Sequence, residues 1–323
     1  MTATLLLARQ LVRRARASWI ITVAAATLAT PWVVRHGVGR LEQVETTSLG
    51  AAVADLYDAG LQHDLARVAA SERVPTSGRH LGFDTSVYPG DAAMRRWKEA
   101  GAPYEWVGFY LPAPCHRDDS WSGKRQTLTE LGFGTAVIYV GQQTWGGTPK
   151  PGSPAAQRAQ RAGKRCDVDF VGGPRGDAEG ADAIARTAAE GFGRGTIVYL
   201  DVERMERMPQ TMRAYYRTWI RRLLADGRYV PGVYVHAHNA AAVHQDLVAE
   251  YRAAGVAAAP PVWVASERGF TRDAAPTDVG HQFAGVWQGM LDIVEHHGGI
   301  ALPIDVNVAA VPSPSDQYAL AGD

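Results

Sequence analysis

A regular alternation of short apolar runs with helical segments, between residues 80 and 312, constrains the fold of this chain more than any other feature. The runs are rich in β-branched and aromatic residues and are apolar on both faces, which is typical of parallel strands covered by helices. They occupy residues 81–84, 106–110, 135–140, 196–201, 232–236, 262–265, 283–287 and 303–307. Helical patterns lie between the earlier runs, at about residues 90–100, 177–192, 209–226 and 239–254.

Strands that alternate with helices in this way predict an α/β protein with a (β/α)8 TIM-like barrel. The last strands are joined by short connections without a helical pattern, so we expect the barrel to be irregular in its C-terminal part. The structural alternative is a doubly wound open sheet. Such a sheet normally carries a glycine-rich phosphate loop after its first strand, and the segment 84–87, Asp-Thr-Ser-Val, is not one.

The N-terminal segment predicts the compartment. An apolar run at residues 19–34 follows Arg13, Arg14 and Arg16, and no acidic residue precedes Glu42. A basic region followed by an apolar stretch is typical of an export signal, and the basic flank keeps the N-terminus in the cytoplasm. Both cleavage and retention as a signal anchor remain open. We therefore expect a protein that is secreted or anchored to the outer face of the cytoplasmic membrane.

Four regions follow from these patterns. We expect a signal or anchor helix over residues 1–35, a stalk or helical segment over 36–79, the barrel over 80–312, and a disordered tail rich in serine and proline over 313–323.

The net charge and the number of cysteines argue against some classes of partner and site. The net formal charge is zero, which argues against a nucleic-acid partner. The two cysteines, Cys115 and Cys166, are too few for a disulfide scaffold and lack the spacing of a zinc site. A single bridge between them and two free thiols both remain open.

Acidic residues stand at the ends of the expected strands, where barrel enzymes place their active sites. Asp84 closes the first strand, Asp201 and Glu203 close the fourth, and Asp305 lies on the last. Any one of these carboxylates could cap the following helix or turn. The four together favour a site at the C-terminal edge of the barrel.

The triplet Asp201-Val202-Glu203 carries the most specific chemistry. Residues two apart on a strand point to the same side, so both carboxylates should face the barrel mouth, roughly 7 Å apart. Their repulsion raises the affinity of one for a proton, and one protonated plus one ionised carboxyl is the pair that glycosidic cleavage needs. The competing interpretation is a divalent-metal site formed with Asp84 and Asp305. His236 and His238 share one side of a strand but lack a third ligand, and we expect neither a metal nor another cofactor.

Aromatic residues lie along the same edges, and flat rings stack well on sugars. We expect Tyr110, Tyr234, Trp263 and Trp287 to line a glycan cleft, and His236 to hydrogen-bond a substrate hydroxyl. Tyr88, Trp121 and Trp145 also belong to this aromatic set. The alternative is that these rings simply fill the barrel wall and the layer beneath the helices.

The order of several short motifs resembles the glycoside hydrolase family 25 lysozymes. A closer similarity is to the glycoside-hydrolase-like domain family of exported actinobacterial proteins, and it covers about residues 80–312. The motifs are Gly82-Phe83-Asp84, Tyr110-Leu-Pro-Ala-Pro, Ser120-Trp121, Tyr199-Leu-Asp201-Val-Glu203, Gly232-Val-Tyr234, Trp287-Gln288 and Ile304-Asp305-Val-Asn307.

This resemblance implies a barrel that acts on peptidoglycan or another cell-wall polysaccharide. Glu203 would be the general acid, Asp201 would stabilise charge on the acetamido group or the sugar, and Asp84 would help shape the pocket. Asp305 and Gln288 would position substrate. The leading hypothesis is thus a lysozyme-like or muramidase-like hydrolase.

Two other hypotheses remain open. One is a non-catalytic protein that binds cell-wall glycan through the same carboxylates and aromatic rings. The other is a metal-dependent deacetylase or esterase of wall polymers, in which His236 would join Asp84 as a ligand.

Overall fold

The computed structural model describes residues 78–144, 166 and 171–315. The expected signal or anchor, the stalk up to residue 77, Trp145 and residues 316–323 of the expected tail lie outside the described residues. Within the described part of the chain, no helix combines the length and the apolar character needed to cross a membrane.

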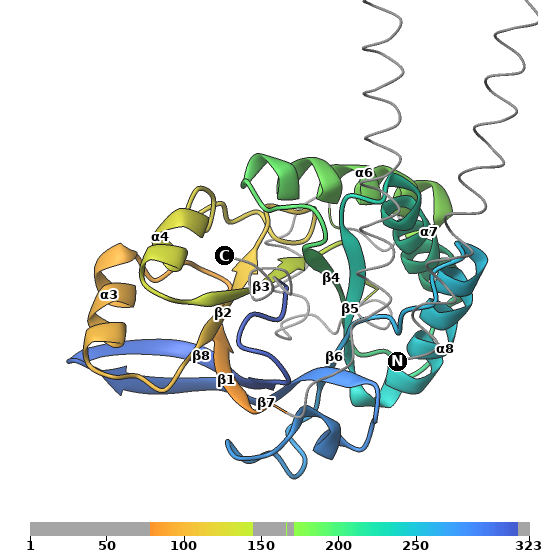
Figure 1. The fold of residues 1–323 in the computed structure, drawn as a ribbon. Helices are drawn as coiled ribbons and strands as arrows, with labels where there is room; N and C mark the ends of the chain where they lie inside the picture. Colours follow the sequence, from red (N-terminus) through yellow and green to blue (C-terminus); the bar gives the residue numbers. More distant parts are fainter. Residues whose placement is uncertain (1–77, 145–165, 167–170, 316–323) are drawn as a thin grey trace, which may run out of the picture. The chain divides into compact units, whose positions relative to one another are not determined.

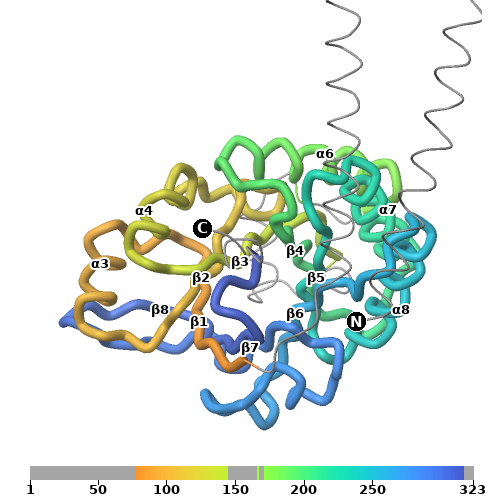
Figure 2. Tube along the Cα trace, viewed as in Figure 1, coloured from red at the N-terminus to blue at the C-terminus, as the bar shows by residue number. Residues whose placement is uncertain are grey.

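Eight strands form a closed barrel in chain order, so the open sheet is excluded. Figure 2 follows the chain once around the barrel, from the orange first strand to the blue last one. The strands are β1 (His80–Asp84), β2 (Trp106–Tyr110), β3 (Gly134–Tyr139), β4 (Ile197–Val202), β5 (Val230–His236), β6 (Val262–Ala265), β7 (Ala284–His297) and β8 (Ile300–Ala309).

Five α-helices and one short 3-10 helix surround the barrel in the described residues (Figure 1). They are α3 (Asp91–Glu99), α4 (Arg125–Glu130), α6 (Gly173–Ala189), α7 (Gln210–Asp226), α8 (Ala237–Ala253) and η3 (Pro276–Val279). The four expected helices are confirmed. The short α4 was not expected, because it holds a single buried side chain, Leu128, and so shows no apolar period.

The barrel is irregular where the sequence predicts it. Strands β1 to β7 pair in parallel, whereas β8 runs antiparallel to both β7 and β1. No crossover helix joins β7 to β8, and the turn at Gly298 and Gly299 reverses the chain with positive φ angles of 57° and 81°. Both strands extend well beyond the expected apolar runs, because their outer parts pair with each other instead of being buried in the barrel. The tip of this hairpin accepts hydrogen bonds from Arg96 and Trp97 of α3, at Gly298 O and Ile300 O, both at 3.0 Å.

Alternation along the strands separates two apolar layers. The larger layer lies between the sheet and the helices and includes Val202, which is completely buried. The smaller layer fills the barrel interior, where Trp263 meets Trp106 and Tyr199 at ring-centroid distances of 5.7 Å. Gly82 permits this packing, because a Cβ there would lie 2.1 Å from the Trp106 indole.

The prediction of a disordered tail is wrong for residues 313–315. Ser315 fills the gap between β3 and β4 at their N-terminal ends: its N–H donates to Thr135 O and its carbonyl accepts from the Ile197 N–H. The Ser315 hydroxyl accepts from the Val137 N–H at 2.7 Å, and Ser313 accepts from the Thr135 N–H at 3.1 Å. Composition suggested disorder, but these strand ends offer backbone groups that need partners.

Candidate active site

The strand-end acids gather around one cavity of about 100 Å³. It is lined by Asp84, Tyr110, Ile138, Asp201, Glu203, Tyr234, Trp263, Gln288 and Asp305. The structure therefore brings together the four acids and four of the residues expected to contact substrate.

Asp84 lies at the centre of a hydrogen-bonded network at the end of β1. Its Oδ1 accepts from the Tyr110 hydroxyl at 2.7 Å, and its Oδ2 accepts from Asn307 Nδ2 at 2.8 Å and Gln288 Nε2 at 2.9 Å. Burial raises the pKa of Asp84 and outweighs these three donors, which lower it. Gly108 makes the room, because a Cβ there would lie 2.5 Å from Asp84 Cβ. Asp84 is thus a fixed part of the pocket wall.

Asp201 presents an acceptor without a donor. Its Oδ1 is shielded from solvent and has no hydrogen-bond partner among the residues that the structure describes. Burial raises the pKa of Asp201 well above its ordinary value, and the charges of Glu203 and Asp84 raise it further. A buried acceptor of this kind is costly unless a ligand supplies the missing donor.

Glu203 directly follows β4 and is exposed at the cavity. The alternation expected for the triplet is confirmed, because Val202 packs in the outer layer while both carboxylates line the cavity. Gln143, which is 1% exposed, links the backbone of the two acids. Its Nε2 donates to Asp201 O at 2.9 Å, and its Oε1 accepts from the Glu203 N–H at 3.3 Å. This side chain therefore fixes the end of the strand that carries both carboxylates.

Asp305 approaches the cavity from β8. Its Oδ1 accepts from the Asp292 N–H at 2.7 Å and its Oδ2 accepts from Gln288 Nε2 at 3.2 Å. Burial, followed by the charge of Asp84, raises the pKa of Asp305 to about 8. Asp292 adopts a φ of 51°, which is unusual for a residue other than glycine, and its N–H is held against the site.

Tyr234 and Trp263 form one wall. The Tyr234 hydroxyl donates to Gln288 Oε1 at 2.6 Å, and Trp263 Nε1 donates to Asn307 Oδ1 at 3.1 Å. Trp263 is fully buried and is enclosed by Trp106, Tyr199 and Tyr234. It supports the cavity and offers no open ring face for a sugar to stack on.

Two residues expected to contact substrate lie elsewhere. Trp287 is 1% exposed, packs edge-on against Phe270 and donates from Nε1 to Ser266 O at 2.8 Å. His236 is the N-cap of α8, where its Nδ1 accepts from the His238 N–H at 3.1 Å. Neither lines the cavity, because each side chain satisfies a local packing or capping need.

Tyr88 and Trp121 also belong to the core and not to the cavity. Their ring centroids lie 4.9 Å apart beneath the loop that follows β1, and Trp121 Nε1 donates to Thr85 O at 3.2 Å. For these two rings the packing interpretation holds.

Gln143 and Asn307 were missed as site residues. Asn307 had a usable signal, because it lies two residues after Asp305 and so points to the same side of β8. Gln143 had none, because it follows its strand in a loop whose path the sequence does not reveal.

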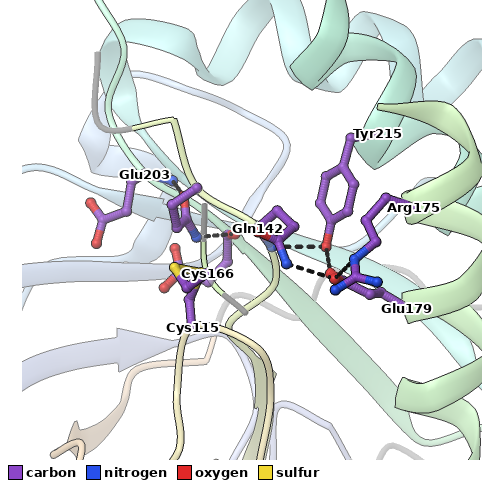
Figure 3. The surroundings of a disulfide bond; sticks show 9 residues. Cys115, Gln142, Cys166, Arg175, Glu179, Glu203 and Tyr215 are labelled. Atoms are coloured by element: carbon purple, nitrogen blue, oxygen red, sulfur yellow. Dashed lines mark hydrogen bonds and ion pairs between the residues drawn. A yellow bond between two sulfur atoms is a disulfide. The ribbon is translucent and has the colours of Figure 1, made fainter. Parts of the chain in front are cut away.

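The open question about the cysteines is answered by a disulfide between Cys115 and Cys166. It joins the segment after β2 to the segment before α6, and the Cys115 N–H donates to Val140 O at 3.1 Å. Figure 3 shows the bridge near Glu203 and Gln142, so it ties Cys166 to the segment after β2 close to the cavity.

The sequence over residues 95–309 matches the family described as Rv2525c-like, glycoside hydrolase-like domain. The chain belongs to this family, which confirms the resemblance. Its fold is also similar to that of several solved structures. The Tat-secreted protein Rv2525c of Mycobacterium tuberculosis, in complex with L-tartrate, is 17% identical, with a TM-score of 0.41 over 72% of this chain and 95% of that chain.

Two further solved structures show comparable similarity. An uncharacterized B. stearothermophilus protein is 16% identical, with a TM-score of 0.48 over 71% of this chain and 95% of that chain. The modular autolysin LytC of Streptococcus pneumoniae is 14% identical, with a TM-score of 0.47 over 73% of this chain and 48% of that chain. No curated protein matches the sequence.

Proposed function

We propose that this glycoside hydrolase-like protein cleaves β-linked amino sugars of peptidoglycan or a related cell-wall polysaccharide. The observation that carries the proposal is the unpartnered, buried Oδ1 of Asp201 beside the exposed Glu203, on the same side of β4. The cavity is smaller than the roughly 300–1,000 Å³ of pockets that enclose a whole small ligand. It suits one substituent of a sugar, with the ring lying across the mouth.

Glu203 is the proposed general acid. Its exposed position allows it to reach a glycosidic oxygen and donate a proton as the bond to C1 breaks. Asp201 Oδ1 accepts the N–H of the sugar's acetamido group, and its negative charge stabilises the positive charge that develops when the acetamido oxygen attacks C1. Water then opens this intermediate and returns its proton to Glu203, so the acid is regenerated.

The placement of the proton follows from the same geometry. In the free protein the proton is favoured on Asp201, because burial and the neighbouring charges raise its pKa. A substrate N–H at Oδ1 would favour the ionised form of Asp201 instead. Binding would therefore leave Asp201 ionised, as the proposed stabilisation of positive charge requires.

A non-catalytic glycan-binding protein is the second candidate. The small cavity and the fixed, hydrogen-bonded Asp84 favour it, because both features suit recognition without requiring bond cleavage. The metal-dependent alternative has less support, because His236 caps α8 instead of approaching Asp84.

Export is proposed together with this function. The disulfide supports it, because such bonds persist in oxidising compartments outside the cytoplasm. Whether the N-terminal segment is cleaved or anchors the protein to the membrane stays a prediction.

The test is incubation of the full chain with purified peptidoglycan beside the Glu203→Gln variant. Reducing ends and released fragments are followed by mass spectrometry, and binding is followed by sedimentation with the wall. We expect cleavage that disappears in Glu203→Gln while binding persists. Glu206→Gln is the matched control, because Glu206 is an exposed acid on the same loop and should leave cleavage intact.

Equal cleavage by wild type and Glu203→Gln would refute the role of the acid. Tight sedimentation without any cleavage would favour the binding protein.

A further inference from the structure

A second, larger pocket lies between the segment after β2 and α6, with a volume of about 640 Å³. Pro112, Ala113 and Pro114 supply apolar surface on one side, and the charged side chains of α6 face them. The volume is in the range of pockets that hold small organic ligands.

This pocket adjoins the carboxylate cavity without being part of it. The rings of His116, in the pocket, and Tyr110, in the cavity, lie 4.9 Å apart between centroids. Successive glutamines also serve the two sites: Gln143 binds the backbone of Asp201, and Gln142 Nε2 donates to Glu179 at 2.8 Å. In Figure 3, Glu203 and Arg175 lie on opposite sides of Gln142.

The charges of the described residues that line the pocket leave one positive charge in excess. Arg117, Arg175 and Arg186 line it together with two acids, Glu179 and Asp182. Arg175 pairs with Glu179 at 2.7 Å, and Arg186 Nε pairs with Asp182 Oδ2 at 2.7 Å. Glu179 also accepts from Gln142 and the hydroxyl of Tyr215, so this acid is already saturated with donors.

Two arginine side chains in the pocket, Arg117 and Arg186, have N–H groups that could bind a ligand. Arg117 is exposed and forms no ion pair within the described residues, and the pair of Arg186 with Asp182 uses Nε alone. One excess positive charge matches a monoanion better than a phosphate dianion.

The His116 side chain is a second, independent observation that indicates a ligand in this pocket. Its side chain is 9% exposed and lines the pocket, and its Nε2 is buried without a hydrogen-bond partner in the described part of the chain. Burial lowers the pKa of His116, so the ring is neutral at pH 7 and can offer or accept one hydrogen bond. A buried, unsatisfied nitrogen on a side chain that lines a pocket is expected where a ligand completes the bonding.

We propose that this pocket binds an organic ligand that carries a carboxylate on a small apolar body, such as the end of a short peptide. Arg117 and Arg186 bind the carboxylate, the prolines and alanine contact the apolar body, and His116 hydrogen-bonds a polar group of the ligand. The inference does not depend on glycosidic cleavage.

The experiment uses ligand-observed saturation-transfer NMR on the full chain, with N-acetylalanine as the probe and N-acetylalaninamide as its neutral match. We expect the acid to bind at least about tenfold more tightly than the amide, because its hydrogen bonds to arginine are charge-assisted. Arg186→Gln and Arg117→Gln should each weaken binding of the acid by about tenfold. Arg252→Gln is the matched control: Arg252 is exposed on α8 and should leave binding unchanged.

Glu203→Gln separates this proposal from the proposed function, because it should abolish cleavage and leave probe binding intact. If Arg186→Gln fails to fold, the exposed Arg117→Gln still tests the site. Equal binding of acid and amide would overturn the proposal, and so would binding that survives both pocket variants. Inorganic phosphate that displaces the probe more strongly than acetate would also overturn it, in favour of a phosphate site.

Discussion

Removal of the disulfide should lower the free energy of unfolding by about 4 kcal/mol. Cys115 and Cys166 are 51 residues apart, and the loop between them contains α4 and β3. In the chain-entropy treatment, closing a loop of this length removes about 14 cal/mol/K from the unfolded state, which corresponds to about 4 kcal/mol at 25 °C. The expected loss is a large fraction of the 5–15 kcal/mol that typically stabilises a folded domain.

The measurement is equilibrium unfolding in guanidinium chloride of the oxidised wild type and the Cys115→Ser/Cys166→Ser double variant. We expect the midpoint to fall while the near-ultraviolet circular dichroism of the native state is unchanged, because the buried tryptophans keep their packing. Wild type unfolded in the presence of reductant should behave like the double variant. A loss below about 1 kcal/mol would refute the reasoning, since it would mean that the unfolded chain gains little freedom when the loop is opened.

Further predictions concern the carboxylate cavity. Gln143→Met should lower the free energy of unfolding by about 1–3 kcal/mol, because the Asp201 carbonyl and the Glu203 N–H lose their buried partner. The same variant should lower turnover more than substrate binding. Unchanged thermal unfolding and turnover would contradict this prediction. Trp263→Phe should cost a similar amount by leaving Asn307 Oδ1 without its donor, and chemical denaturation checks it. The pKa of Asp305 is raised to about 8, so between about pH 4 and pH 8 the folded state holds a proton that the unfolded state has released. The free energy of unfolding should therefore fall as the pH rises from about 4 to 8. Asp305→Asn should flatten this fall in melting curves at pH 5 and pH 8, and an equal slope in both proteins would contradict the assignment.

The sequence determined the barrel and the carboxylate pair for a simple physical reason. Apolar runs of strand length between amphipathic helices leave few ways to bury both faces of a sheet, so the strands of the barrel were predictable. Strand alternation is equally local, and from the sequence alone it predicts that Asp201 and Glu203 lie on one side of the strand. The same rule would have found Asn307 from Asp305.

Tertiary structure decided what depends on distant parts of the chain. Trp263 and Trp287 look alike in sequence, yet one lines the cavity and the other packs against Phe270, because neighbouring strands and loops determine what each ring meets. Gln143 reaches the backbone of β4 only because the loop after β3 folds over it, and Ser315 is ordered only because β3 and β4 leave backbone groups unpaired. Burial and charge also come from the assembled barrel, so only the structure reveals that Asp201 carries a raised pKa and an acceptor oxygen without a partner.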